Sequence, residues 1–280
     1  MTALPEPFSP KRSPGPQINT EQPNLGRMYD YYLGGSFNYS IDRARAEQVC
    51  GVLPCMTMLA RSNRGFVRRT VRFMIDEGIE QFLDIGSGIP TNENTHEVAL
   101  AGNPAARVVY VDNEPIAVTH GQRILADTVG ARIVQADLRE PQTILNHPEV
   151  TDLIDFRKPV GVLMGGVLVF VPDYEDPAGL VAAYRDGCAP GSYIAISHLT
   201  HDEADPVTRG QVDTMVGIYR GGGEHLYVRE RVELTRWFDG LELVPPGVTL
   251  MDDWRPDPNR AVDSDSPARW LGYGGVGQVV

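Results

Sequence analysis

The chain has 280 residues, and its 42% hydrophobic and 22% charged residues are ordinary proportions for a globular protein. A formal net charge of −12 argues against binding to a nucleic-acid backbone, because proteins that neutralise phosphates concentrate lysine and arginine. Three cysteines without a CxxC pair exclude a disulfide framework and indicate a reducing, cytoplasmic location.

The N-terminal segment is rich in proline. Residues 1–24 contain six prolines and few large apolar side chains, so we expect a flexible tail there. The segment also lacks the basic and apolar regions of a secretory signal peptide. The longest apolar run, residues 159–172, is about 14 residues long, whereas a membrane span needs roughly 20. We therefore expect no membrane segment.

An N-terminal helical cap is predicted over residues 25–80. It opens with aromatic residues that run into a glycine turn, Tyr29-Asp-Tyr-Tyr-Leu-Gly-Gly35. Ser40 can cap a helix that ends at Gly51. A second amphipathic helix is expected over residues 56–77.

One face of this second helix carries arginines that are spaced three or four residues apart. They are Arg61, Arg64, Arg68 and Arg72. Such a stripe can bind an anionic ligand. The simpler interpretation is a solvated helix face whose arginines pair with nearby acids.

From residue 81 onward the sequence alternates between strand-like and helix-like segments, as in a parallel sheet covered by helices. The expected strands are 81–85, 107–112, 132–136, 160–164 and 192–197. The expected helices are 92–101, 115–127 and 176–187.

Residues 202–227 break this alternation with many polar groups, and we interpret them as an insertion over the site. A helix near 228–238 follows. Residues 241–244 and 270–280 suit an antiparallel pair at the sheet edge. We therefore predict a Rossmann-like α/β fold for residues 81–280, with a seven-stranded, mostly parallel sheet and helices on both of its faces.

Three acids close the first three apolar runs of strand type. They are Asp84, Asp112 and Asp137. Because the carboxyl ends of parallel strands meet at one edge of the sheet, we expect these acids to lie along that edge. Open α/β sheets bind their ligands at this edge. The three acids together are far more specific than any one of them.

A glycine turn follows the first strand, in the segment Asp84-Ile-Gly86-Ser87-Gly88. Glycines without Cβ atoms let the backbone approach a ligand, and N–H groups at a helix start offer donors. The third glycine of the dinucleotide-binding fingerprint would fall at Thr91, so that fingerprint is absent. Alone, the turn could also be purely structural.

The second and third acids each have a ligand-binding interpretation. Asp112 stands where an acid accepts hydrogen bonds from ribose hydroxyls, and Asp137 could accept from an exocyclic amine. Asp112 could alternatively cap the next helix, a role that Asn113 or Glu114 could also fill, with Pro115 in the first turn.

With these features the chain resembles the class I S-adenosylmethionine-dependent methyltransferases. It is also similar to an actinobacterial group of methyltransferases with no assigned substrate, and this similarity covers residues 25–280. The segments that carry it are Tyr29-Asp-Tyr-Tyr-Leu-Gly-Gly35, Phe82-Leu-Asp-Ile-Gly-Ser-Gly-Ile-Pro-Thr91, Val109-Tyr-Val-Asp-Asn113, Ala136-Asp-Leu-Arg139 and Val169-Phe-Val-Pro-Asp173.

The resemblance implies S-adenosylmethionine as cofactor. It assigns the methionine end to the glycine turn, the ribose to the second-strand acid and the adenine to the third-strand acid. The expected cofactor-binding residues are Asp84, Gly86, Ser87, Gly88, Asp112, Asn113, Asp137, Leu138 and Gly165.

The methyl acceptor is expected to be a small molecule. Some relatives carry an Asn/Asp-Pro-Pro-Tyr signature after the fourth strand, and its absence from Met164-Gly-Gly-Val167 argues against methylation of base amino groups. An NAD-dependent oxidoreductase and a non-catalytic S-adenosylmethionine-binding regulatory module are the alternatives. Two features argue against the oxidoreductase: the dinucleotide-binding fingerprint lacks its third glycine, and an acid follows the third strand.

Two side chains are candidates for a catalytic role. Tyr31 belongs to the aromatic segment that we expect to cover the cofactor, where a ring can face the sulfonium through cation–π contacts. His198 follows the fifth strand in His198-Leu-Thr-His201, and histidine titrates near neutrality. Such a histidine pair followed by acids is also a common surface pattern, which is the simpler interpretation, and no metal site is predicted.

Overall fold

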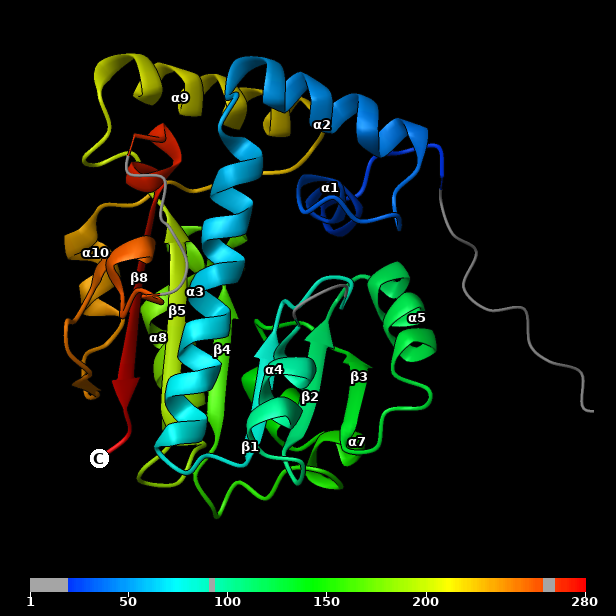
Figure 1. Ribbon diagram of the computed structural model, residues 1–280, viewed down its shortest axis with the longest axis vertical. Coiled ribbons are helices and arrows are strands. Elements are labelled where there is room, and N and C mark those ends of the chain that lie inside the picture. The colour runs from blue at the N-terminus through cyan, green and yellow to red at the C-terminus, as the bar shows by residue number, and fades with distance from the viewer. Residues whose placement is uncertain (1–19, 91–93, 259–264) are drawn as a thin grey trace, which may run out of the picture.

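The structure is a computed structural model that describes residues 20–90, 94–258 and 265–280. Its centre is a single sheet of eight strands (Figure 1). The strands are β1 (Gln81–Ile85), β2 (Arg107–Asp112), β3 (Ala131–Gln135), β4 (Gly161–Gly165), β5 (Tyr193–Leu199), β6 (Glu242–Leu243), β7 (Thr249–Leu250) and β8 (Gly272–Gln278).

The strand order confirms the predicted Rossmann-like fold. The path is β3-β2-β1-β4-β5-β8-β6. Its first five strands are parallel to one another, and β8 runs antiparallel to β5. The predicted antiparallel edge pair is β6 with β8. The extra strand is β7, which pairs with β8 and has only two residues, too few to produce a periodic sequence pattern.

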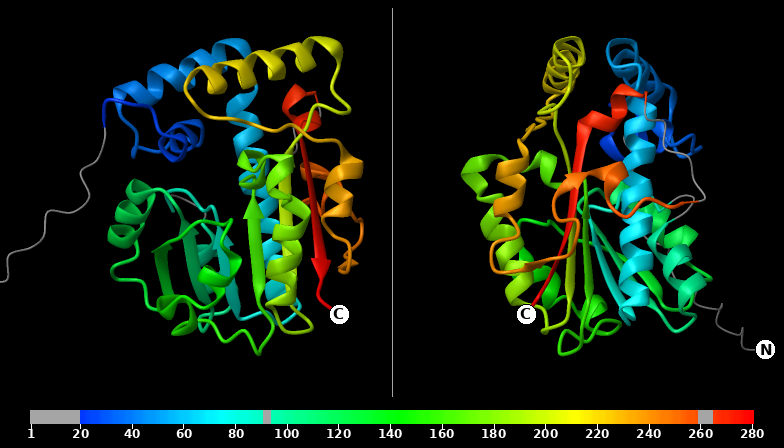
Figure 2. Two further views of the ribbon diagram at one scale, coloured as in Figure 1. Left: turned by 180° about the vertical axis from the view of Figure 1, so that it is seen from behind. Right: turned by 60° about the vertical axis from the view of Figure 1, so that its left-hand side comes forward.

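Helices cover both faces of the sheet (Figure 2). One face carries α3 (Met56–Asp76), α4 (Thr95–Gly102) and α5 (Pro115–Ile124). The opposite face carries α6 (Pro141–Leu145), α7 (Pro148–Thr151), α8 (Pro177–Asp186) and α10 (Arg231–Arg236). Both faces are apolar because neighbouring strand residues such as Phe82 and Leu83 point to opposite sides and are both fully buried.

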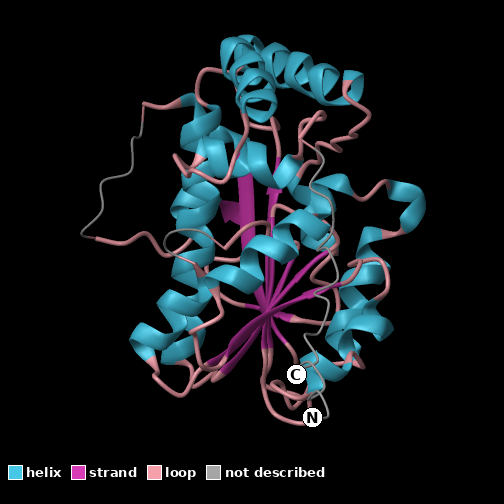
Figure 3. Cartoon of the chain, turned by 90° about the vertical axis from the view of Figure 1, so that its right-hand side faces the viewer, coloured by secondary structure: helices cyan, strands magenta, loops and turns pink. Residues whose placement is uncertain are grey.

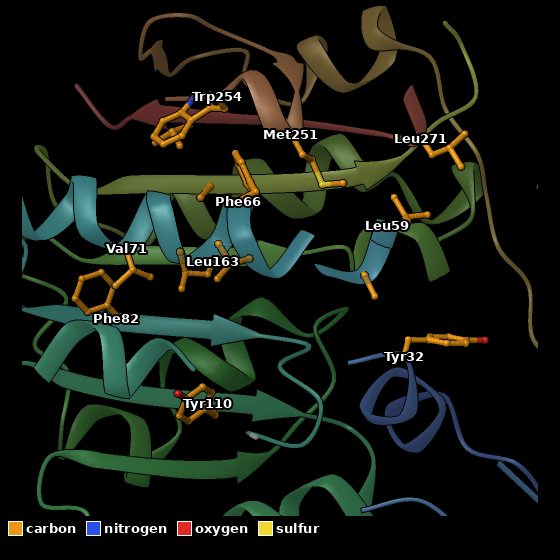
Figure 4. Close-up of a cluster of buried hydrophobic side chains, with 14 of the residues drawn as sticks. Tyr32, Leu59, Phe66, Val71, Phe82, Tyr110, Leu163, Met251, Trp254 and Leu271 are labelled. Carbon is orange, nitrogen blue, oxygen red and sulfur yellow. The ribbon is translucent and has the colours of Figure 1, made fainter. Parts of the chain in front are cut away.

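Helix α3 packs along the sheet instead of belonging wholly to the cap. Its Phe66 and Phe73 meet the ring of Trp254 edge to face, with centroids 5.6 and 5.7 Å apart. Figure 4 shows this helix above β1, with Val71 close to Phe82. Only the first turns of α3 reach the strand ends, so the predicted cap of residues 25–80 includes a helix that belongs to the sheet layers.

Three other helices form the cap beyond the carboxyl edge of the sheet (Figure 3). They are α1 (Leu25–Tyr32), α2 (Ser40–Val52) and α9 (Pro206–Gly221). The hydroxyl groups of Tyr32 and Tyr219 lie 3.0 Å apart and join α1 to α9. Helix α9 lies in the segment that we interpreted as a polar insertion. None of the described helices is long and apolar enough to cross a membrane.

The cap is fastened by buried polar contacts at its N-terminal end. Arg27 Nε donates to Asp42 at 2.7 Å, and both side chains are fully buried. Asn24 caps α1 and donates through its amide to Glu114 at 2.7 Å. Residues 20–24, which we assigned to the tail, are thus described and partly bonded, whereas residues 1–19 lie outside the described part.

We expect Gly274→Ala to lower the free energy of unfolding by about 1–3 kcal/mol, because the new Cβ overpacks the core. A Cβ at Gly274 would lie 2.6 Å from the Phe66 ring, whereas one at Gly210 in α9 meets nothing within 4 Å. The control Gly210→Ala should stabilise by about 0.4–1 kcal/mol. Urea unfolding measures both, and equal effects would contradict this packing.

Candidate active site

A cavity of about 480 Å³ lies between the carboxyl edge of the sheet and the cap. This volume suits a small-molecule site, for which roughly 300–1,000 Å³ is usual. We call its two parts the sheet lobe and the cap lobe. The sheet lobe is lined by Asp84, Gly86, Ser87, Gly88, Asp112, Asn113, Ala136 and Leu138. The cap lobe is lined by Tyr29, Tyr32, Met56, Leu59, Met215, Tyr219, Leu226, Tyr227, Met251 and Leu271.

The structure brings most of the predicted cofactor residues to this cavity. Besides the sheet lobe residues, Gly165 at the end of β4 lines it. Asp137 is the exception, because its neighbours Ala136 and Leu138 line the cavity and it does not. Its carboxylate accepts from the backbone N–H of Arg139 at 2.9 Å. An adenine contact through the Asp137 side chain therefore stays a prediction.

The glycine turn is tightly constrained. Gly86 has φ +66°, and a Cβ there would lie 2.0 Å from the side chain of Val167. Gly88 also has a positive φ, +64°, but a Cβ there would meet only open space. Both conformations favour glycine.

The donors of this turn differ from our expectation. The N–H groups of Gly86 and Ser87 both donate to the Val111 carbonyl. Helix α4 begins only at Thr95, so these N–H groups do not belong to a helix start. The turn therefore lets a ligand approach its backbone closely, beside two buried carboxylates in the cavity wall. The N–H groups of Gly86 and Ser87 already have an acceptor.

Asp84 is held at the end of β1 and is only 5% exposed. Its Oδ2 accepts from the Thr95 hydroxyl at 2.6 Å. Burial raises the pKa of this carboxyl to about 6, although Thr95 and the nearby Arg64 guanidinium act in the opposite direction. A cationic group of a ligand would stabilise the ionised form.

Asp112 ties the second strand to the glycine turn. Its Oδ2 accepts from Gly88 N–H at 2.7 Å, and its Oδ1 accepts from Glu114 N–H at 2.9 Å. Burial raises its pKa, and these two N–H groups oppose that shift. Asp112 is not the cap of α5, because Glu114 occupies the N-cap position with Pro115 after it, as the second alternative had it. Asp112 bonds to the N–H of that cap residue and also lines the cavity.

The arginine stripe of α3 divides into separate environments. Arg64 lines the cavity and lies 3.4 Å from Asn94 Oδ1 and 5.9 Å from the centre of the Tyr29 ring. Arg68 is buried, and Arg72 pairs with Asp257 at 3.3 Å on the surface. Surface pairing with an acid therefore describes Arg72 but not Arg64, whose place in the cavity the spacing could not reveal.

Tyr31 does not line the cavity, which corrects its predicted catalytic role. Its hydroxyl donates to Glu47 of α2 at 3.3 Å, outside the site. Residues two apart on a helix point in different directions, and the tyrosines of this segment that line the cavity are Tyr29 and Tyr32. The aromatic segment thus reaches the cavity, but not through the tyrosine that we singled out.

A hydrogen-bonded chain fixes Tyr29 against the sheet. Ser197 Oγ of β5 donates to Asn63 Oδ1, with 2.5 Å between the two oxygens. The amide nitrogen of Asn63 therefore faces the other way, donating to Tyr29 Oη at 2.8 Å and to the Gly165 carbonyl at 3.3 Å. Tyr29 in turn donates to the Ala60 carbonyl at 3.2 Å.

His198 lines the cavity but is not free to act as a base. Its Nδ1 lies 2.8 Å from the Leu199 carbonyl, so this nitrogen carries the proton. Its Nε2 lone pair accepts from Arg229 at 3.0 Å. Burial, together with the Arg229 charge, lowers the pKa of His198 to about 4. The predicted catalytic role is therefore replaced by a structural one.

Arg229 connects this histidine to the loop after β4. It is only 5% exposed and donates to the carbonyls of Leu168 and Val171 and to the Asp173 carboxylate. Two of these partners, Val171 and Asp173, belong to the segment Val169–Asp173 that we singled out in the sequence, so this segment has a structural role in holding Arg229. No pattern in the sequence indicated an arginine so far along the chain as the partner of His198.

The second histidine of the pair lies away from this network. His201 Nε2 is 3.6 Å from an Asp213 oxygen near the surface. Within the described ranges, no group of three or more His, Cys, Asp or Glu side chains could hold a metal ion.

Comparison with known proteins agrees with this geometry. Residues 11–280 match the S-adenosyl methyltransferase family. The chain belongs to this family. No curated protein matches the sequence.

Two crystal structures are similar over nearly the whole chain. A candidate methyltransferase from Thermobifida fusca YX shares 40% identity, with a TM-score of 0.85, over 95% of this chain and 99% of its own. A DUF574 family protein from Streptomyces avermitilis MA-4680 shares 35% identity, with a TM-score of 0.88, over 94% of this chain and 100% of its own. The protein is accordingly an S-adenosylmethionine-dependent methyltransferase, and the oxidoreductase alternative is set aside.

We expect Asp84→Asn to stabilise the ligand-free methyltransferase by about 1–3 kcal/mol at pH 8, because it removes a buried charge. The raised pKa means that the folded protein binds this proton more tightly than the unfolded chain. Wild type therefore loses stability as pH rises through about 6, and the gain should shrink between pH 8 and pH 5. Urea unfolding of both proteins measures this, and a pH-independent gain would contradict it.

We expect Arg229→Met to lower the free energy of unfolding by about 3 kcal/mol, because buried carbonyls and His198 lose their donor. The control is Arg231→Met, two residues away, whose side chain is 44% exposed and pairs with Glu203. That change should cost less than about 1 kcal/mol. Similar losses in thermal or urea unfolding would show that the Arg229 network is not structural.

Proposed function

We propose that the sheet lobe binds S-adenosylmethionine and that a small-molecule methyl acceptor enters the cap lobe. The observation that carries this proposal is a single cavity whose walls include the glycine turn, both buried acids and the aromatic residues of the cap. Donor and acceptor sites that share one cavity allow direct transfer without a covalent enzyme intermediate.

The chemistry of the sheet lobe fits the donor from end to end. Asp112 can accept hydrogen bonds from ribose hydroxyls, and the apolar side chains of Ala136 and Leu138 can flank an adenine. The open space beside Gly88 leaves room for the ligand against the backbone. We therefore propose the predicted cofactor residues as its binding site, with Asp137 in a supporting position beside it.

The amino-acid end of the donor requires groups of both charges. Asp84 and Arg64 line the same part of the cavity and are close enough for the guanidinium to influence the carboxyl pKa. Asp84 suits an ammonium group, and Arg64 suits a carboxylate. We propose this pair as the recognition site for the methionine end. For Arg64 this is the anionic-ligand role that sequence analysis offered for the whole stripe as the less simple interpretation.

When bound, S-adenosylmethionine supplies a sulfonium methyl group to a nucleophile of the acceptor. The residues of this chain hold the two molecules in line and exclude water from between them. His198 contributes no base, since its lone pair accepts from Arg229. An acceptor atom that is nucleophilic without assistance fits such a site best.

The cysteines support the expected cytoplasmic location within this proposal. Cys50, Cys55 and Cys188 are all free thiols. Burial raises the pKa of each, so none is an activated nucleophile. Exclusion of nucleic acid as a partner remains a prediction from net charge.

We expect Arg64→Met to weaken S-adenosylmethionine binding at least about tenfold, because the donor carboxylate loses a charged partner. Arg72→Met, a change of the same kind two turns along α3, should leave the affinity unaltered. Calorimetry with 5′-deoxy-5′-methylthioadenosine, which lacks the amino-acid end, should show equal affinity for wild type and Arg64→Met.

The same titrations test the proposed function itself. Wild type should bind S-adenosylmethionine and S-adenosylhomocysteine and should not bind NAD. If neither sulfur nucleoside binds, the sheet lobe is not the donor site. If both bind and Arg64→Met has no effect, only the assignment of the methionine end is wrong.

A further inference from the structure

The cap lobe differs in chemical character from the sheet lobe. Its walls combine leucines and three methionines, Met56, Met215 and Met251, with the rings of Tyr29, Tyr32, Tyr219 and Tyr227. Figure 4 shows Leu59, Leu271 and Met251 gathered near the carboxyl ends of the strands, with Tyr32 projecting from α1 on the other side. These side chains come from segments far apart in sequence, so the lobe is built by the cap as much as by the sheet.

The charged group nearest this lobe is the buried Arg229 guanidinium, 5.6 Å from the centre of the Tyr227 ring, and it is already bonded to Asp173, two carbonyl groups and His198. The titratable side chains beside it in the cavity wall are uncharged at neutral pH. His198 is a neutral imidazole that donates to one carbonyl and accepts from Arg229. Tyr32 and Tyr219 share a hydrogen bond, and burial raises the pKa of both phenols. The carboxylate of Glu224 and the imidazole of His225 also line the cavity, but both residues are exposed at its rim.

This distribution selects against a charged acceptor. A charged group transferred from water to such a lobe loses its hydration, and the buried cation beside the lobe, Arg229, is already paired with Asp173. An uncharged ring loses little, and it gains contacts with aromatic faces and with polarizable methionine sulfur. Methionines also adapt to ligands of different outlines.

Tyr29 holds a hydroxyl group in a fixed position where the cap lobe meets the sheet lobe. Its hydroxyl accepts from Asn63 and donates to the Ala60 carbonyl. A phenolic oxygen that already donates its proton can take a further hydrogen bond only as an acceptor. Gly165 shares the Asn63 amide with Tyr29, so this oxygen is tied to the end of β4, beside the predicted donor site.

We infer that the methyl acceptor is an uncharged aromatic molecule that lies in the cap lobe and donates a hydrogen bond from a hydroxyl or amino group to Tyr29. This inference rests on the proposed function, because it takes the sheet lobe as the donor site. Tyr29 acts as a specificity-determining residue, and Asn63 and Ser197 position it.

Three probes that share one ring system and differ in charge test the inference. They are 2-naphthol, 2-naphthoate and 2-(aminomethyl)naphthalene, which are neutral, anionic and cationic at neutral pH. Each is titrated calorimetrically into protein saturated with S-adenosylhomocysteine. We expect 2-naphthol to bind at least about tenfold more tightly than either charged probe. Equal affinities, tighter binding of a charged probe, or no binding of 2-naphthol at roughly millimolar concentration would overturn the inference.

Matched variants locate the binding. Met56→Glu places a carboxylate in the cap lobe and should weaken 2-naphthol binding at least about tenfold while favouring the cationic probe. Thr57→Glu makes a comparable change on the neighbouring residue of α3, which does not line the cavity, and should have no effect. An equal effect of both variants would place the probe elsewhere and overturn the inference.

Binding of S-adenosylhomocysteine separates the two possible failures. If the variants and wild type bind it equally while the neutral probe shows no preference, only the inference about the acceptor fails. If wild type does not bind it, the proposed function fails first. Tyr29→Phe should bind 2-naphthol more weakly than wild type and should retain affinity for 2-methylnaphthalene, which has no group to donate; an equal loss for both probes would overturn the role of Tyr29.

Discussion

Two buried carboxylates at adjacent strand ends impose the main constraint on this structure. Asp84 and Asp112 are 5% and 9% exposed, and a charged carboxylate at such depth is costly without donors around it. The donors come from Thr95 at the start of α4 and from the N–H groups of Gly88 and Glu114. Satisfying the acids therefore fixes the glycine turn and the first turn of the following helix.

This compensation is incomplete in the ligand-free protein. Burial raises the pKa of both acids, so each ionised carboxylate still lacks some of the stabilisation that water would give it. An ammonium group or ribose hydroxyls at the same place would complete their hydrogen bonds. The two acids therefore lower the stability of the ligand-free protein, and a bound donor such as S-adenosylmethionine can offset this loss. Residues that serve function at the expense of stability are common in active sites.

The sequence predicted the strands and the edge of the sheet at which the acids meet, because both follow from the pattern of apolar and polar residues along the chain. Strands β1 and β2 begin and end at the predicted residues, because each is a short, buried, apolar run closed by a polar group. The parallel register then brings Asp84 and Asp112 to one edge, as expected. Helix α9 was missed, although Asp205 caps it and Pro206 occupies its first position, because polar residues obscured its apolar stripe.

The sequence pattern could not predict side-chain pairs that form only when distant segments pack together. The choice of Tyr29 over Tyr31 depends on how α1 is rotated above the sheet, and both residues carry the same ring. His198 looked like a base because its partner, Arg229, belongs to a loop that only the folded chain brings beside it. Such pairings arise from packing and leave no periodic pattern in the sequence.

The two lobes of the cavity differ in how their walls are held, and this difference bears on the evolution of specificity. Sheet lobe residues lie at the ends of strands whose positions are set by backbone hydrogen bonds across the sheet. Six of the ten cap lobe residues lie on α1, α3 and α9. Of these helices, α1 and α9 meet through a side-chain contact, the Tyr32–Tyr219 hydrogen bond. Substitutions in the cap can therefore reshape the acceptor site while the donor site keeps its geometry. Under the proposed function, the cap therefore determines the choice of acceptor and the sheet edge the choice of methyl donor.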